Sequence, residues 1–181
     1  MTLKTCKPFL RLIPLLCLVL LLGGCYSFTG TNISPEIKTI SITNFSNASG
    51  QGPSNLQQFI TEDFKDYFQR NTSLRLVPQG GDLQINGQIT SYSFSPAAIQ
   101  RTDVPAGGNI GLDQAGANRL TIVIQINYTD TKNQANSFDR SFSGFFDFPI
   151  SQDINQIQRP QIQRITEPII YKVFTSTVAN W

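Results

Sequence analysis

The architecture of this chain is set by the segment Arg119-Leu120-Thr121-Ile122-Val123-Ile124-Gln125-Ile126-Asn127-Tyr128-Thr129. Leucine, isoleucine and tyrosine occupy every second position, and the positions between them carry threonine, valine, glutamine and asparagine. A period of two is typical of a β-strand with one face in a core. The segment therefore predicts a strand over residues 119–129 that has one apolar and one semi-polar face.

A second strand is predicted directly after the first. Residues 130–136 are polar and indicate a turn, and residues 137–148 carry four phenylalanines in one phase: Phe138, Phe142, Phe146 and Phe148. Two alternating runs joined by a short polar turn predict a β-hairpin. Phe145 is out of that phase, so we expect it on the opposite side of the strand. If no helix covers that side, Phe145 is a candidate contact for a partner.

Two helices are predicted from a different period. Apolar side chains recur at a spacing of 3.6 residues over residues 56–71 and again over residues 161–179. Pro168 lies inside the second pattern. Because an internal proline removes a hydrogen bond and clashes with the preceding turn, we expect a break or kink near Glu167.

Shorter apolar runs predict further strands over residues 36–45, 74–77 and 83–89, with Gly87 as a candidate bulge. The predicted order of elements is β-α-β-β-β-β-α. This order predicts an α+β fold, a two-layer sandwich in which a mixed or antiparallel sheet of about four to five strands carries two helices on one face.

The N-terminal segment predicts export and lipidation. Basic residues precede an apolar run that ends in Leu22-Gly23-Gly24-Cys25, as in a bacterial lipoprotein processing site. We therefore expect residues 1–24 to be a signal peptide. Cys25 is then the first mature residue, bearing a diacylglycerol and an N-acyl chain, and residues 25–35 form a tether to a single domain over residues 36–181.

Composition argues against several classes of function. Three of the fourteen basic residues precede Cys25, which leaves eleven against twelve acidic residues, so we expect no nucleic-acid partner. The chain has no histidine, and its other two cysteines, Cys6 and Cys17, lie in the signal segment. The commonest general base and the commonest nitrogen ligand of metals are therefore missing. We predict a protein that is not an enzyme and that has neither a metal site nor a cofactor beyond its acyl chains.

Four segments in order along the mature chain resemble one family: Tyr26-Ser27-Phe28-Thr29-Gly30, Pro35-Glu36-Ile37-Lys38-Thr39-Ile40, Asn118-Arg119-Leu120-Thr121-Ile122 and Val178-Ala179-Asn180-Trp181. Together with the processing site, they resemble the LptE lipoproteins of lipopolysaccharide assembly, in their Bacteroidetes form. The resemblance implies a compact α/β sandwich that plugs the lumen of an LptD-type β-barrel, supports assembly of that barrel and binds lipopolysaccharide. It also implies an outer-membrane location within the barrel. Because no acidic run follows Cys25, we expect the protein to face the periplasm.

Charge and position suggest which residues contact lipopolysaccharide. Four cations lie on or beside the predicted hairpins, where they can meet lipid phosphates: Arg101, Arg119, Lys132 and Arg140. The alternative is that they are ordinary surface charges, or partners of the acids close by in sequence, which are Asp103, Asp113, Asp130 and Asp139.

Two other functions remain open at this stage. A lipid or lipoprotein carrier would hold an acyl chain in an apolar cavity between sheet and helices, whereas a plug has a filled core and a polar surface. The many glutamines and asparagines at outward strand positions favour the plug, because a barrel lumen is polar. A glycan-degrading enzyme needs two facing carboxylates, and the sequence suggests no such pair.

Overall fold

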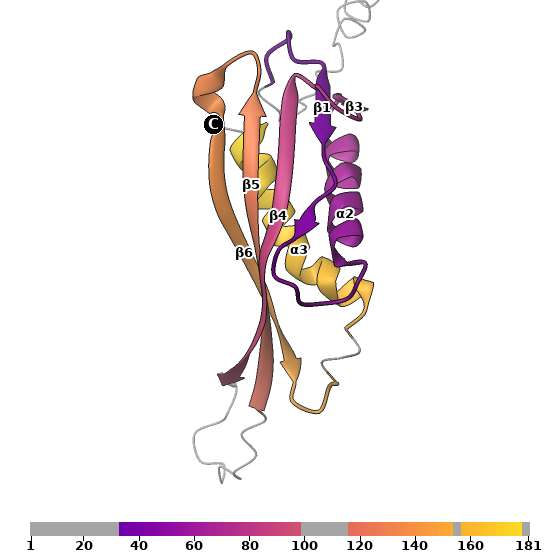
Figure 1. The fold of residues 1–181 in the computed structure, drawn as a ribbon, viewed down its shortest axis with the longest axis vertical. Helices are drawn as coiled ribbons and strands as arrows, with labels where there is room; N and C mark the ends of the chain where they lie inside the picture. The colour runs from indigo at the N-terminus through magenta and orange to yellow at the C-terminus, as the bar shows by residue number, and fades with distance from the viewer. Residues whose placement is uncertain (1–32, 99–115, 154–156, 179–181) are drawn as a thin grey trace, which may run out of the picture. The chain divides into compact units, whose positions relative to one another are not determined.

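The computed structural model describes residues 33–98, 116–153 and 157–178 (Figure 1). Cys25 lies outside these ranges, as do the predicted signal peptide and most of the tether. The described elements, in chain order, are β1 (Thr39–Ile42), β2 (Ser46–Asn47), α2 (Leu56–Asn71), β3 (Arg75–Val77), β4 (Leu83–Ala98), β5 (Gly116–Asp130), the short 3-10 helix η1 (Gln134–Asn136), β6 (Phe138–Pro149) and α3 (Arg159–Thr177).

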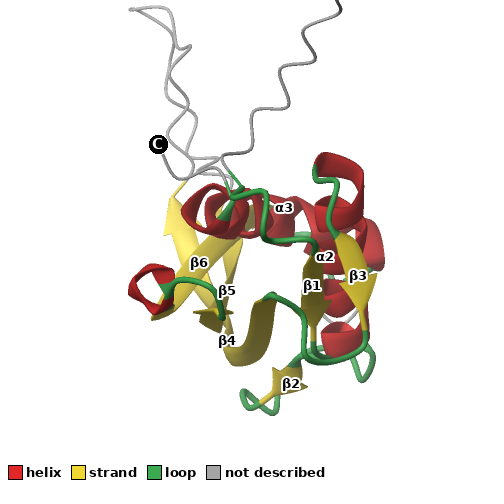
Figure 2. Ribbon diagram, turned by 90° about the horizontal axis from the view of Figure 1, so that it is seen from above, coloured by secondary structure: helices red, strands yellow, loops and turns green. Residues whose placement is uncertain are grey.

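The strands form one mixed sheet in the order β3-β1-β4-β5-β6, and β2 pairs separately with β4. β1 is parallel to both of its neighbours, whereas β4, β5 and β6 are antiparallel. Both helices lie on the same side of the sheet (Figure 2), with α3 against β5 and β6 and α2 against β1 and β3. The predicted α+β sandwich is confirmed. Its sheet has six strands because the two-residue β2 adds to the five that the sequence indicates.

The predicted hairpin is confirmed as β5 and β6. Its ladder runs without interruption from Ala117 opposite Pro149 to Tyr128 opposite Phe138. The even-numbered apolar residues of β5 face the helices and are fully buried: Leu120, Ile122, Ile124 and Ile126. The period of two in the sequence therefore separates a buried side of this strand from its outward side.

A bulge in β4 falls at a different place from the one expected. The register with β5 shifts between Ile89 and Ser91, so the inward-facing residues change from odd to even numbers along β4. Gly87, the predicted bulge, instead lies directly beneath the ring of Phe45, where a Cβ atom would overlap that ring. Gly87 therefore permits a close approach and does not interrupt pairing.

The second helix continues through Pro168, so the break expected near Glu167 is absent, and the kink stays a prediction. Residues on both sides of the proline are completely buried, including Ile165, Ile169 and Val173. Burying each such side chain contributes about 1.5–3 kcal/mol, whereas an internal proline costs about 3 kcal/mol. Packing along the whole helix therefore outweighs the local penalty.

Close contact between β6 and α3 requires a glycine. A Cβ atom on Gly144 would overlap the carbonyl oxygen of Ile165 and touch the side chain of Ile169. Because the first of these atoms belongs to the backbone, the helix as a whole would have to move. Gly144 therefore sets the distance between this helix and the edge strand of the sheet.

Asp82 fastens the N-terminal segment to the start of β4. Its Oδ2 accepts hydrogen bonds from the backbone N–H groups of Lys38 and Thr39, both at 3.0 Å, and from the Thr39 hydroxyl at 2.7 Å. The backbone N–H of Lys38 is the largest cause that lowers the pKa of Asp82 to about 2. The charged carboxylate is thus the form that holds this end of the sheet together.

We predict that Gly144→Ala lowers the free energy of unfolding by about 1–3 kcal/mol, because overpacking against a fixed backbone forces a shift of α3. Urea titration monitored by circular dichroism measures this change. Ser143→Ala, at an exposed neighbouring position, is the matched control and should stay within about 0.5 kcal/mol of the wild type. Equal effects of the two variants would contradict the assignment.

A second prediction concerns acid stability. The pKa of Asp82 is lower in the folded state than the value of about 3.9 for a free side chain, so its contribution is fully present above about pH 5. That contribution is lost as the pH falls from about 4 through the folded-state pKa of about 2. Asp82→Asn should therefore be less stable than the wild type at pH 7, and the difference should shrink below pH 3. Urea midpoints measured across this range test it, and a constant difference would contradict the proposed role.

Candidate functional site

One side of the sheet carries no helix along β4, β5 and β6, and we call this side the open face. Its side chains are those that alternate with the buried residues of these strands. They are Gln84, Asn86, Gln88, Ser91, Ser93 and Ser95 on β4, Arg119, Thr121, Val123, Gln125, Asn127 and Thr129 on β5, and Asp139, Ser141, Ser143, Phe145 and Asp147 on β6. The open face is thus rich in amides and hydroxyls.

Hydrogen bonds order part of the open face. The amide nitrogen of Gln125 donates to Asp139, and the hydroxyl of Ser141 donates to the amide oxygen of Gln125. The Thr90 hydroxyl donates to the carbonyl oxygen of Val123 at 3.3 Å. Most other amides and hydroxyls there project into solvent, which makes the surface suited to hydrogen bonding with another polar surface.

One ionic and aromatic cluster marks the end of the open face near the start of β5. Arg119 forms two hydrogen bonds with Asp147, at 2.7 and 2.8 Å, and its guanidinium carbon lies 4.1 Å from the centre of the Phe145 ring. Hydrogen bonding from Arg119 holds the pKa of Asp147 below its usual range. Phe145 lies on this side, as its strand phase predicts, and is 57% exposed. Its contact with a partner stays a prediction.

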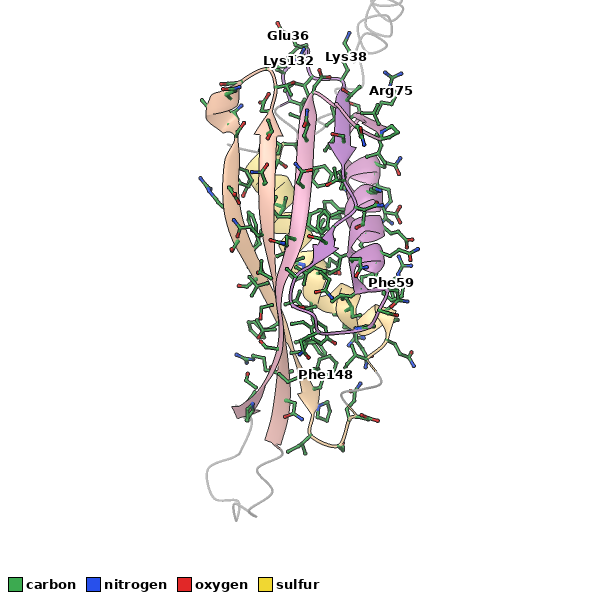
Figure 3. All side chains as sticks on the ribbon, in the orientation of Figure 1. Glu36, Lys38, Phe59, Arg75, Lys132 and Phe148 are labelled. Atoms are coloured by element: carbon green, nitrogen blue, oxygen red, sulfur yellow. The ribbon has the colours of Figure 1, made fainter. Side chains whose placement is uncertain are left out.

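The four cations proposed from the sequence do not form one site. Arg119 and Lys132 lie near opposite ends of β5, which separates them by more than about 30 Å at the rise of an extended strand. Figure 3 shows Lys132 at the same end as Glu36 and Lys38, and Phe148 lies toward the other end. Arg140 stacks on Phe138, with 5.1 Å between the guanidinium carbon and the ring centre. Arg101 lies outside the described residues.

The acids that pair with these cations differ from those expected. Arg119 pairs with Asp147, and Lys132 lies 3.4 Å from Asp82. Asp130, an expected partner, instead accepts hydrogen bonds from the backbone N–H groups of Lys132 and Asn133. In the part of the chain that the structure describes, Arg140 has no ion pair, so it is the candidate whose charge is most available.

Two cations that the sequence analysis did not single out lie beside β6. Arg164 of α3 has its guanidinium carbon 5.5 Å from the centre of the Phe146 ring, and Lys172 of α3 donates to the Ser143 carbonyl at 3.5 Å. Neither forms an ion pair with an acid of the described residues. The helical period indicates that both are exposed, but only the position of α3 over β6 places them at this edge.

The remaining charged cluster joins the two helices. Arg159 lies 3.0 Å from Glu62 and 3.1 Å from Asp63, and it stacks on Phe59. Burial raises the pKa of Asp63, and the hydrogen bond from Arg159 opposes that effect. The cluster sits where α3 begins and holds the two helices together, so we interpret it as structural.

Other features bear on the alternative functions. Buried side chains from both layers fill the space between sheet and helices, among them Ile60, Phe64, Ile122 and Ile165, each fully inaccessible. A hollow of about 450 Å³ lies beside β3, and both apolar and polar side chains line it: Ile42, Thr43, Asn44, Lys65, Leu76, Val77, Pro78 and Gln79. Within the described ranges, no group of three or more acids or cysteines is placed to hold a metal ion. Neither of the described helices is long and apolar enough to cross a membrane.

Comparison with known proteins gives a family match. The sequence profile of the LptE family, described as lipopolysaccharide-assembly, matches residues 37–176. No curated protein sequence matches the chain at a significant level.

Three solved structures align with most of this chain. A hypothetical protein from Chlamydia trachomatis aligns with a TM-score of 0.51 and 9% identity, covering 79% of this chain and 99% of that one. A lipoprotein from Neisseria meningitidis gives 0.42 and 10%, covering 75% and 97%. A minor lipoprotein from Acinetobacter baumannii gives 0.43 and 10%, covering 77% and 95%. At these identities, the first of the three supports the fold alone.

Proposed function

The chain belongs to the LptE family of lipopolysaccharide assembly, and from this we propose that it is a lipoprotein that plugs an LptD-type outer-membrane β-barrel and supports its assembly. In this proposal, acyl chains on Cys25 hold the protein in the outer membrane, and the domain faces the periplasm from within the barrel. The role is non-enzymatic and needs no cofactor beyond the covalent lipid.

The observation that carries the proposal is the composition of the open face. Three adjacent strands present mainly amide and hydroxyl side chains on their outward side, with Val123 and Phe145 as apolar exceptions. The charged residues among them are Arg119, Asp139 and Asp147. The lumen of an outer-membrane barrel is polar, and lumen-facing side chains alternate with lipid-facing ones along its strands. The open face can therefore form hydrogen bonds with the inner wall of such a barrel.

The filled core supports a plug over the alternative, a carrier of lipids or lipoproteins. A carrier holds an acyl chain in an apolar cavity, typically of several hundred Å³. Here the helices meet the sheet through tightly packed aromatic and aliphatic side chains, such as Phe45 and Phe64, whose rings lie 4.8 Å apart. The space that a carrier would use is occupied by the protein itself.

Direct contact with lipopolysaccharide is the second part of the proposal. A phosphate group needs cations that are not already neutralised by neighbouring acids. Among the candidates within the described residues, Arg119 and Lys132 each have an acidic partner, and Arg140 has none. Arg140 is therefore the first residue to test, followed by Arg101.

We predict that the tagged, lipidated protein co-purifies from outer membranes with an LptD-type barrel in near-equal amounts. Asn127→Trp on the open face should reduce the recovered barrel at least about tenfold, equivalent to about 1.4 kcal/mol, because the indole is bulky and cannot replace the amide hydrogen bonds. Quantitative mass spectrometry of the eluate measures the ratio.

Gln69→Trp, on the exposed side of α2, is the matched control and should retain the barrel. If the barrel were lost only in the α2 variant, the helices and not the open face would form the contact with the barrel. Recovery of the wild type with lipid and no barrel would favour the carrier.

We further predict that Arg140→Glu weakens binding of the purified soluble domain to lipopolysaccharide by about tenfold, since a charge-assisted contact contributes about 1.5–3 kcal/mol. Arg140→Lys keeps the charge and should bind far better than the glutamate variant. Fluorescence titration with labelled lipopolysaccharide measures both. Unchanged binding in the double variant Lys132→Glu with Arg140→Glu would exclude these residues.

A further inference from the structure

The two edges of the sheet are built differently. β3, at one edge, is three residues long, which leaves little backbone exposed. β6, at the other edge, is twelve residues long and pairs with β5 at every position without a bulge. On its outer side β6 pairs with no strand of the described residues. A long and regular edge of this kind presents a row of free backbone donors and acceptors.

Two hydrogen bonds show which backbone groups point outward. The Val123 carbonyl accepts from Thr90 of β4, so the backbone groups of Val123 point toward β4 and away from β6. Ser143, the partner of Val123 in the ladder, has its carbonyl near Lys172 of α3 and not in that ladder. Because direction alternates along a strand, the odd-numbered residues of β6 present their N–H and C=O groups to the free edge.

The usual protection of such an edge is weak here. Natural edge strands are interrupted by bulges, prolines or charged side chains, especially lysine. In β6 the proline is the last residue, and no charge falls in the central run Ser141–Phe146. Among the described residues, Lys172 of the neighbouring helix donates to the outward carbonyl of Ser143.

We propose that β6 is a strand-addition site for an extended segment of the barrel partner. The identity of the partner rests on the proposed function. A closed barrel wall has no free edge, so the segment comes from a loop or a terminus of that protein. Strand addition supplies main-chain hydrogen bonds, and the alternating side chains of the added strand supply selectivity.

The side chains beside β6 indicate which side chains the added strand carries. On the side toward α3, Arg164 and Lys172 lie beside β6 without an acidic partner in the described residues. On the open face, Phe145 is exposed next to the edge. The added strand therefore carries acidic side chains toward α3 and an apolar or aromatic side chain toward Phe145.

A second copy of this chain fits the edge less well. Two-fold pairing centred on Ser143 would set Asp139 of one copy opposite Asp147 of the other, twice. It would also bring the Lys172 side chains of both copies to the same seam. Like charges directly opposite each other are destabilising. A segment whose acidic side chains lie only toward α3 pairs with Lys172 and places no carboxylate opposite Asp139 or Asp147.

The test is hydrogen exchange of the β6 amides in the lipidated protein, free and in complex with the LptD-type barrel encoded by the same genome. We expect the amides of Ser141, Ser143 and Phe145 to exchange quickly in the free protein and at least about tenfold more slowly in the complex. Ser143→Pro removes an outward donor and leaves the β5 ladder intact, so it should abolish this protection. Ser143→Ala is the matched control and should keep it.

The other outcomes of this experiment distinguish a failure of the strand addition from a failure of the proposed function. A complex in which these amides stay unprotected overturns the strand addition and leaves the plug standing, whereas the absence of any complex overturns both. A concentration-dependent dimer with protected β6 amides would assign the edge to a second copy and overturn the proposal. If Ser143→Pro fails to fold, Arg164→Glu with Lys172→Glu replaces it and should reduce protection in the complex at least about tenfold.

Discussion

Burial of one face of β5 beneath α3 is the contact that organises this protein. Four consecutive inward residues of the strand are completely inaccessible to solvent, and Gly144 on β6 lets the helix approach closely enough to cover them. Because side chains alternate across a strand, covering one face fixes the position of every residue on the other. The polar open face is therefore a direct consequence of where the helix packs.

Much of this arrangement could be predicted from local patterns. The alternation in residues 119–129 and 137–148 predicts the hairpin. The helical spacing after Leu56 predicts a helix over residues 56–71, and α2 has these bounds. These patterns can be recognised within a short stretch of sequence because each element has one apolar and one polar face. Pro168 shows the limit of such reasoning, since its penalty is offset by contacts with a sheet that lies distant in sequence.

The ion pairs of the candidate site are harder to predict from the sequence. The ion pair of Arg119 with Asp147 joins residues 28 positions apart, and it exists because strand register sets them side by side. Lys132 and Asp82 are likewise distant in sequence and meet only because β4 and β5 are antiparallel neighbours. A cation can be recognised in one sequence, but its partner depends on register. The edge position of β6 also follows from sheet order, which periodicity does not encode.

The position of β1 has a consequence for how the chain acquires its structure. β1 lies between β3 and β4, so an early segment pairs on both sides with segments that follow it by more than thirty residues. The apolar face of β5 is covered by α3, near the end of the chain. A polypeptide that emerges from its N-terminus cannot bury this face until α3, which ends at Thr177, is available. Loop closure therefore precedes most stabilising contacts, which slows folding and leaves apolar strands exposed for longer. During that interval, exposed apolar strands favour aggregation over folding.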